Sequence, residues 1–130
     1  MSNDENNPSD AAVTQFILDQ IESVPHLEAL LLLSGTRPRK WTIDELSKRL
    51  YIRREAVRII LDDLLRKRLL SLDSTDSTYY YSAPEEQDRL IRLLDEIYRR
   101  QVVRVSQLIH SKPSAAVRDF ARAFRFTKEE

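Results

Sequence analysis

The chain lacks, or has few of, the residues on which several classes of protein depend. It has no cysteine among its 130 residues, which excludes disulfide bonds and thiolate metal sites. Its single glycine excludes a glycine-rich phosphate loop and, with only five prolines, argues against sandwich or barrel folds built on many tight turns. Two histidines, His26 and His110, are far apart and show no metal-ligand spacing. We therefore expect a mostly helical protein without a metal or cofactor.

Long hydrophobic runs are also missing. The four leucines from Leu30 to Leu33 are far short of the roughly 20 apolar residues that a membrane span needs, so no membrane partner is expected. The first ten residues, MSNDENNPSD, are polar and acidic, unlike the basic and apolar start of a secretory signal. A chain of this length is expected to form one core with room for extensions. The prediction is a cytoplasmic protein with a disordered leader over residues 1–10.

Charge is balanced overall but unevenly spread. Lysine and arginine number 21, as do aspartate and glutamate. Residues 1–35 carry six acids and no lysine or arginine, a net −6, whereas residues 36–68 carry eleven basic residues and five acids, a net +6. Residues 97–128 carry eight basic residues and one acid, a net +7. Two basic zones of this kind suit a polyanionic partner, although ordinary solvated faces would give the same pattern.

Two helices are predicted before residue 36. Apolar residues recur every three or four positions over residues 11–23, which is typical of an amphipathic helix. Pro25 cannot continue that helix and stands in the first turn of the next one. The second helix is almost wholly apolar near its end and is predicted to stop at Gly35 as its C-terminal cap.

The next helix start has a specific signature. Thr42 and Glu45 have the spacing of a capping box, in which each side chain accepts a hydrogen bond from the other residue's backbone amide. Trp41 and Leu46 flank this box at the spacing of a hydrophobic staple. A helix is therefore predicted over residues 43–50.

A tight turn and a longer helix are expected to follow. Tyr51 and Ile52 form the turn, and the helix covers residues 53–67. Its predicted buried stripe is Ala56, Val57, Ile60, Leu61, Leu64 and Leu65. The opposite, solvent-facing row is called the reading face and comprises Arg54, Glu55, Arg58, Asp62 and Arg66. Asp62 and the adjacent Asp63 point about 100° apart on a helix, so they do not suggest a metal pair.

A short hairpin completes this part of the chain. Leu70 and Leu72 alternate with polar residues, a polar tip follows, and Tyr79 and Tyr81 share one face of the returning strand while Tyr80 lies on the other. The tyrosines are expected to pack within the hairpin, with base stacking as the alternative.

The C-terminal part is predicted to be helical. Ser82 and Glu85 repeat the capping-box spacing with Pro84 between them, and a helix of roughly 40 Å is expected from Pro84 to about Ser111. Its apolar stripe is longer than a small domain covers readily, so it is our candidate for homodimerisation, with packing on the first helix as the alternative. The stripe comprises Ile91, Leu94, Tyr98, Val102, Val105 and Ile109. A last short helix over residues 114–125 is amphipathic and cationic, and its Phe120 and Phe124 could dock on the core or on a protein partner.

The order of elements from Trp41 to Ser82 resembles the winged helix-turn-helix regulators of bacteria. The resemblance covers about a third of the chain and implies a fold that is mainly α with a small β-hairpin, extended by helices at both ends. It divides the chain into the leader, a winged helix-turn-helix domain over residues 11–83, and C-terminal helices over residues 84–130. Tyr51 and Arg68 stand where this family often has glycine, and the wing tip holds two acids and no cation, so we expect no wing contact to DNA.

The resemblance also assigns roles to individual residues. It places Leu46, Leu50, Val57, Leu61 and Leu64 in the core. It brings the start of the second helix into the major groove, where the forked guanidinium groups of Arg53, Arg54 and Arg58 can bind guanine or a phosphate. Lysine and arginine nearby are candidates for phosphate contacts that supply affinity without sequence choice, namely Lys48, Arg49, Arg37, Arg39 and Lys40.

Catalysis is not indicated by the sequence. No nucleophile stands beside a base, and no paired carboxylates mark a cleft. The two leading hypotheses are a dimeric transcriptional regulator that binds duplex DNA, and a protein-interaction adaptor on the same scaffold that docks through its C-terminal helices. Neutral net charge and the acidic wing favour the second, and the motif order with its local +6 charge favours the first. A small-ligand sensor is a further alternative, for which the sequence indicates no pocket.

Overall fold

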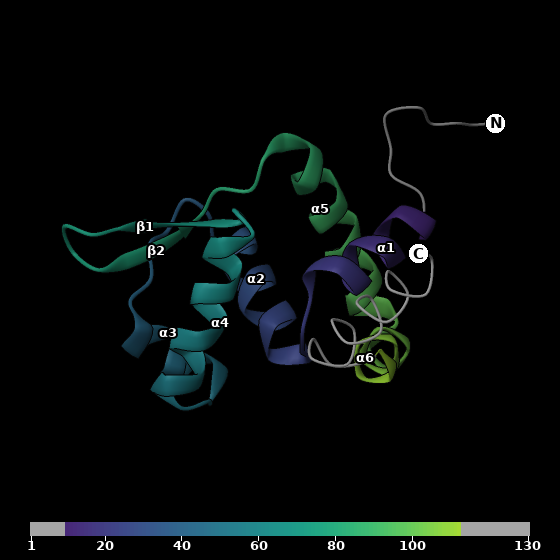
Figure 1. The fold of residues 1–130 in the computed structure, drawn as a ribbon, viewed down its shortest axis with the longest axis horizontal. Helices are drawn as coiled ribbons and strands as arrows, with labels where there is room; N and C mark the ends of the chain where they lie inside the picture. Colours follow the sequence, from purple (N-terminus) through teal and green to yellow (C-terminus); the bar gives the residue numbers. More distant parts are fainter. Residues whose placement is uncertain (1–9, 113–130) are drawn as a thin grey trace, which may run out of the picture.

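The computed structural model describes residues 10–112, which form six helices and one two-stranded hairpin (Figure 1). Helices α2, α3 and α4 and the hairpin form one side of the molecule, and α1, α5 and α6 gather at the other (Figure 1). This mainly helical fold with a small hairpin confirms the predicted fold class. In chain order the elements are α1 (Asp10–Gln20), α2 (Val24–Gly35), α3 (Ile43–Leu50), α4 (Arg54–Arg66), β1 (Leu70–Asp73), β2 (Thr78–Tyr81), α5 (Glu85–Arg100) and α6 (Val102–Ser111).

The predicted capping box at the start of α3 is present. The Thr42 hydroxyl oxygen accepts a hydrogen bond from the Glu45 amide at 3.1 Å, and the Glu45 carboxylate accepts one from the Thr42 amide at 2.9 Å. Trp41 and Leu46, the predicted staple pair, are both buried. Local sequence therefore sets the start of the helix that precedes the tight turn.

Two residues at positions where winged helix-turn-helix regulators often have glycine adopt a left-handed backbone conformation, which glycine favours. Tyr51, in the turn between α3 and α4, has φ 59°, and Arg68, just after α4, has φ 64°. Both angles lie in the left-handed region, where a Cβ atom crowds the backbone. The tight connections of the motif are thus kept without glycine, at some cost in backbone strain.

The hairpin is joined by a short additional partner from the segment before α3. Leu70 pairs with Tyr81 and Leu72 with Tyr79 in antiparallel register. Trp41 exchanges two backbone hydrogen bonds with Tyr79, of 2.8 and 2.7 Å. Tyr79 is buried, in agreement with packing inside the hairpin. The wing is therefore attached to the start of α3 as well as to the end of α4.

The prediction of one long C-terminal helix from Pro84 to Ser111 is wrong, because the structure has two helices there. Gln101 adopts φ −133° and ψ 54°, which ends α5 and starts α6 in a new direction (Figure 1). The second predicted capping box is also absent, since the Ser82 hydroxyl is hydrogen-bonded to the Ser71 hydroxyl at 2.6 Å and no side chain caps α5. The apolar spacing continues through Gln101 because both helices turn their apolar sides toward the same core.

Most of the stripe assigned to dimerisation lies in the core of the single chain. Ile91, Leu94, Val105 and Ile109 are at most 3% exposed, and Tyr98 is half-buried. Helix α1 packs against both α5 and α6, which is the alternative that the sequence left open. Val102 alone among the six remains largely exposed, at 47%.

The ends of α1 and α2 differ from the prediction in detail. Helix α1 stops at Gln20, and Ser23 instead caps α2 by accepting a hydrogen bond from the His26 amide. Gly35 is the last residue of α2 and has no positive φ, so it is not a left-handed cap. Thr36 takes the cap position, and its hydroxyl donates to the Leu32 carbonyl at 2.7 Å.

Two lysines hold the C-terminal end of α1. The Lys67 ammonium, just after α4, donates to the Gln20 carbonyl at 2.7 Å. The Lys112 ammonium, after α6, donates to the carbonyls of Ile17 at 3.2 Å and Leu18 at 3.0 Å, and also to that of Ile21. Cations suit this position because the last carbonyls of a helix have no partner within the helix and carry partial negative charge.

Candidate nucleic-acid interface

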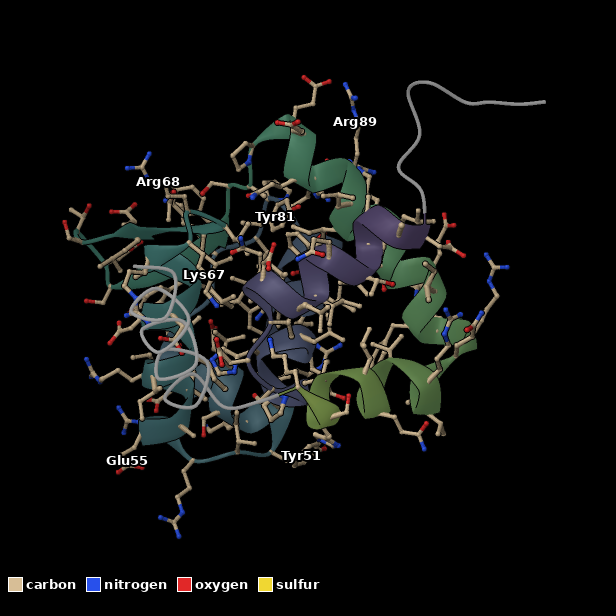
Figure 2. All side chains as sticks on the ribbon, turned by 45° about the vertical axis from the view of Figure 1, so that its right-hand side comes forward. Tyr51, Glu55, Lys67, Arg68, Tyr81 and Arg89 are labelled. Atoms are coloured by element: carbon tan, nitrogen blue, oxygen red, sulfur yellow. The ribbon has the colours of Figure 1, made fainter. Side chains whose placement is uncertain are left out.

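Helices α3 and α4, joined by the turn at Tyr51, form the candidate interface. Of the predicted α4 stripe, Val57, Ile60, Leu61 and Leu64 are buried, and Leu65 is half-buried. Ala56 was predicted to be buried but is exposed. Figure 2 shows Glu55 pointing away from the body of the molecule, near the end where Tyr51 lies. One side of α4 thus anchors the helix, and the other faces solvent.

Four of the predicted DNA-binding cations have no hydrogen-bond or ion-pair partner within residues 10–112. Lys48 and Arg49 lie in the last turn of α3, Arg53 precedes α4, and Arg58 is in its second turn. All four side chains are exposed. None of the ion pairs within residues 10–112 joins Arg58 to Asp62, one turn further along α4. These charges are therefore available to a polyanion.

Arg54 is exposed like these four cations, but it has an ion-pair partner. Its Nε atom lies 2.9 Å from a carboxylate oxygen of Asp44 at the start of α3, so the pair links the two helices of the motif. The side chains are 67% and 58% exposed, respectively. An exposed pair of this kind contributes at most about 1 kcal/mol, so a phosphate could replace Asp44 as its partner.

Arg37 is directed into the protein. Its guanidinium donates to the backbone and side-chain oxygens of Ser34 at 2.8 and 2.9 Å and to the Asp88 carboxylate at 3.0 Å. It also lies 4.4 Å from the centre of the Tyr81 ring. Its contacts join α2, the hairpin and α5, which is a structural role that the sequence did not predict.

Asp88 is the centre of this junction. It accepts hydrogen bonds from Arg37, from the Tyr81 hydroxyl at 2.5 Å and from Arg92 at 2.8 Å. Burial alone would raise the pKa of Asp88, but the hydrogen bonds from Arg37, Tyr81 and Arg92 outweigh it and lower the pKa to about 2. Burial and the bond to Asp88 raise the pKa of Tyr81. Tyr81 lies between the hairpin and α5 (Figure 2), so this ionised carboxylate fixes the base of the wing on α5.

The other two cations of the basic loop contact neighbours of their own. The Arg39 guanidinium lies 3.6 Å from the centre of the Trp41 ring and 3.8 Å from Glu45. Lys40 forms a 2.7 Å ion pair with Asp73 of the wing. The hydrogen bond from Lys40, followed by those from Thr75, lowers the pKa of Asp73 to about 2. Lys40 therefore offsets one of the two acids of the wing.

His26, one of the two histidines that lack metal-ligand spacing, is buried and hydrogen-bonded. Its Nε2 atom is 2.8 Å from the Asp63 carboxylate of α4, and its Nδ1 atom is 2.6 Å from the Ser23 hydroxyl oxygen. Burial would raise the pKa of Asp63, but bonds from His26 and Arg66 lower it. Asp63 thus serves to link α2 to α4. No group of three or more metal-ligating side chains occurs within residues 10–112.

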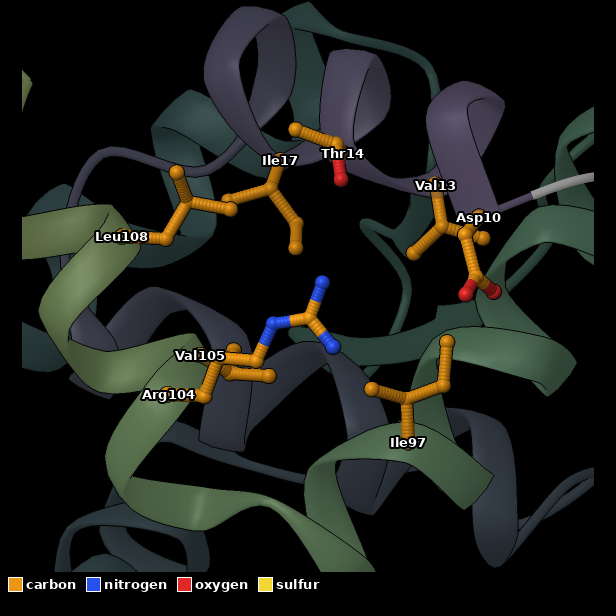
Figure 3. A pocket seen from close by; sticks show the side chains of 8 residues that line it. All are labelled: Asp10, Val13, Thr14, Ile17, Ile97, Arg104, Val105 and Leu108. Carbon is orange, nitrogen blue, oxygen red and sulfur yellow. The ribbon is translucent and has the colours of Figure 1, made fainter.

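A small pocket lies between α1, α5 and α6 (Figure 3). Its volume is about 30 Å³, far below the roughly 300 to 1,000 Å³ of typical small-molecule sites. Apolar side chains form most of the wall, Asp10 and Thr14 add polar groups, and the Arg104 guanidinium extends into the middle of the pocket (Figure 3). A pocket of this size has no room for a small organic ligand.

The remaining sequence predictions concern segments outside the described residues. They are residues 1–9 of the predicted leader and the tail helix with Phe120 and Phe124, whereas Asp10, the last residue of the predicted leader, is the first residue of α1. Within residues 10–112, none of the helices has both the length and the apolar character that crossing a membrane requires.

Comparison with known proteins gives a structural likeness and no sequence family. No family model matches the chain, and no curated protein matches it. The fold is similar to that of a MarR family protein from Bacillus stearothermophilus, with a TM-score of 0.52 and 19% sequence identity over 90% of this chain and 80% of the other. At this identity the likeness concerns the fold alone. The chain therefore has a winged helix-turn-helix fold of the kind seen in that MarR family protein.

Proposed function

We propose that the protein is a non-catalytic transcriptional regulator that binds duplex DNA and places α4 in the major groove. The observation that carries the proposal is the set of four exposed cations around the start of α4, which have no partner within the described residues. Lysine and arginine that bind phosphates release condensed counterions, which supplies affinity without base contacts. The width of the major groove admits one α-helix.

The basic loop before α3 contributes less to this proposal than the sequence suggested. Arg37 and Lys40 each bind a carboxylate, and displacing either would weaken the attachment of the wing. Arg39 retains a largely exposed guanidinium over the Trp41 ring. We therefore assign phosphate contact outside the groove to Lys48, Arg49 and Arg39, and contact along the groove, to a phosphate or a guanine, to Arg53, Arg54 and Arg58.

The test is DNA binding by an Arg53→Ala, Arg58→Ala double variant. Neither side chain has a partner within residues 10–112, so the variant should fold and unfold as the wild type does. We expect its affinity for duplex DNA to fall at least tenfold, and the slope of log affinity against log salt to decrease by about 2. Fluorescence anisotropy with a labelled duplex over a range of salt concentrations measures both.

A matched control removes the same charge elsewhere. Arg99 and Arg100 are exposed on α5, and within residues 10–112 they pair only with acids one turn earlier on the same helix. An Arg99→Ala, Arg100→Ala variant should keep most of the affinity. Equal losses in the two double variants would show a general charge effect and contradict the assignment to α4.

A protein-interaction adaptor is the second candidate. It is favoured by the acids on the solvent side of α4, Glu55 and Asp62, and by the acidic wing tip, where Asp76 is bound only by the Thr78 hydroxyl within the described chain. This hypothesis predicts that the protein gives no gel shift with genomic DNA fragments at low salt. It also predicts that a pull-down recovers one protein partner in stoichiometric amount. Retention of that partner by the Arg53→Ala, Arg58→Ala variant would strengthen it.

We also propose that the regulator acts as a homodimer. Dimers of helix-turn-helix proteins read half-sites about 34 Å apart, one turn of the double helix. Since most of the predicted stripe is buried, the exposed apolar pair Val102 and Val103 at the start of α6 is the better candidate for the contact, at 47% and 68% exposure. Sedimentation equilibrium should show a dimer for the wild type and a monomer for a Val102→Asp, Val103→Asp variant.

A further inference from the structure

Ile59 occupies a position that folding does not explain. It lies in the middle of α4, and its side chain is 61% exposed although the helix buries its other isoleucine, Ile60. An exposed isoleucine adds little packing and is a poorer helix former than alanine. The fold therefore gains little from an isoleucine here.

The neighbours of Ile59 form a regular row on the solvent side of α4. Glu55, Ile59, Asp62 and Arg66 follow the i, i+4, i+7, i+11 spacing of one helix face, and all four are exposed. We call them the outer row. Of this row, Arg66 is paired with Asp63, and the other three carry no positive charge.

The outer row and the cations differ in what they can contact on DNA. Carboxylates repel phosphates, but they accept hydrogen bonds from the amino groups of cytosine and adenine on the groove floor. Arg58 and Arg54 lie to one side of the outer row, where a helix in the groove passes the phosphate backbone. The row with Ile59 at its centre is thus suited to base edges, and its flank is suited to phosphates.

Resting on the proposed function, we propose that Ile59 contacts the 5-methyl group of a thymine in the major groove. That methyl is the apolar group that standard bases present in this groove. Contact would remove both apolar surfaces from water, as burial in a core does. The binding site on DNA would therefore contain a thymine whose methyl group contributes to affinity.

The experiment replaces single thymines by deoxyuridine, which removes the methyl and leaves base pairing intact. Duplexes are first selected with the full chain from unmethylated synthetic DNA, so that a methyl requirement belongs to thymine and not to 5-methylcytosine. At one thymine per half-site, deoxyuridine should weaken wild-type binding about fourfold, which corresponds to about 0.8 kcal/mol. Anisotropy titrations at fixed salt measure the loss.

The variant Ile59→Ala should bind the thymine duplex about fourfold more weakly than the wild type and bind thymine and deoxyuridine duplexes equally well. Ile59→Val, which keeps two methyl groups, should retain part of the preference. Leu72→Ala is the matched control, because Leu72 is another large apolar side chain at 44% exposure and lies on the wing. It should keep the full preference.

Two results would overturn the inference while leaving DNA binding in place. One is a selected duplex at which no thymine is sensitive to loss of its methyl. The other is an Ile59→Ala variant that keeps the wild-type preference for thymine over deoxyuridine. Failure of the wild type to bind any duplex at low salt would instead overturn the proposed function, and this inference with it.

Discussion

Neutralising Asp88 should destabilise the protein, and the effect should shrink in acid. Asp88 accepts hydrogen bonds from Arg37, Tyr81 and Arg92, and only 17% of its side chain is exposed. Asp88→Asn removes the charge and keeps a similar shape. Since the folded pKa of Asp88 lies at about 2, below the ordinary value of 3.8 for an aspartate, the carboxylate stabilises the folded state only while it is ionised.

The size of the effect follows from that difference in pKa. A lowering from 3.8 to about 2 corresponds to about 2 kcal/mol at 1.36 kcal/mol per pKa unit. The contribution is complete above pH 5 and falls as the pH drops through 4 toward 2. At pH 3 it should be about 1 kcal/mol, because the unfolded state then binds most of a proton that the folded state does not.

Urea unfolding of the wild type and Asp88→Asn at pH 6 and pH 3 is the assay. The difference in unfolding free energy should be about 2 kcal/mol at pH 6 and about 1 kcal/mol at pH 3. Asp95→Asn is the control, because Asp95 lies on the same helix and pairs only with exposed Arg99. An equal loss at both pH values, or none at pH 6, would refute the view that an ionised Asp88 holds the wing on α5.

Three further changes test the backbone and the caps, and thermal or urea unfolding measures each. Tyr51→Gly should stabilise the protein by about 0.5 to 1 kcal/mol, because φ 59° is strained for tyrosine. The tyrosine side chain is 92% exposed, so its removal loses no packing. A lower midpoint of unfolding in the variant would show that the exposed ring contributes to folding. Gly35→Ala should add about 0.5 kcal/mol, since Gly35 is helical and an added Cβ meets nothing within 4 Å. Thr42→Ala should cost about 1 kcal/mol by removing the cap of α3, and an unchanged stability would mean that the capping box is dispensable.

The part of the fold that sequence predicted best is the segment from α3 to β2. The capping box at Thr42 and the apolar spacing of α4 involve residues within four positions of each other, so they act whatever the rest of the chain does. The predictions that were wrong lie where a local signal competes with tertiary contacts. Ser82 has the spacing of a cap but bonds to Ser71 across the hairpin, and the helix from Pro84 breaks at Gln101 so that α6 can pack on α1.

The candidate site was predicted in outline. Sequence identified the exposed side of α4 and the cations around it, but it could not separate those with an internal partner from those without one. The predicted reading face holds charged residues only, so it does not include Ile59. Its exposure follows from the side of α4 that the core covers, and Val57, Leu61 and Leu64 of the predicted stripe mark that side.

The order of elements from α3 to β2, and with it the resemblance to a winged helix-turn-helix, was determined by the sequence alone, because caps, turns and periodicity are short-range properties. The tertiary structure decided which cations remain available to a partner. Arg37 meets Asp88 at 51 positions' separation and Lys40 meets Asp73 at 33, and no local pattern records such pairs. Charge in a segment is therefore visible in the sequence, whereas the availability of that charge depends on which distant residues the fold brings beside it.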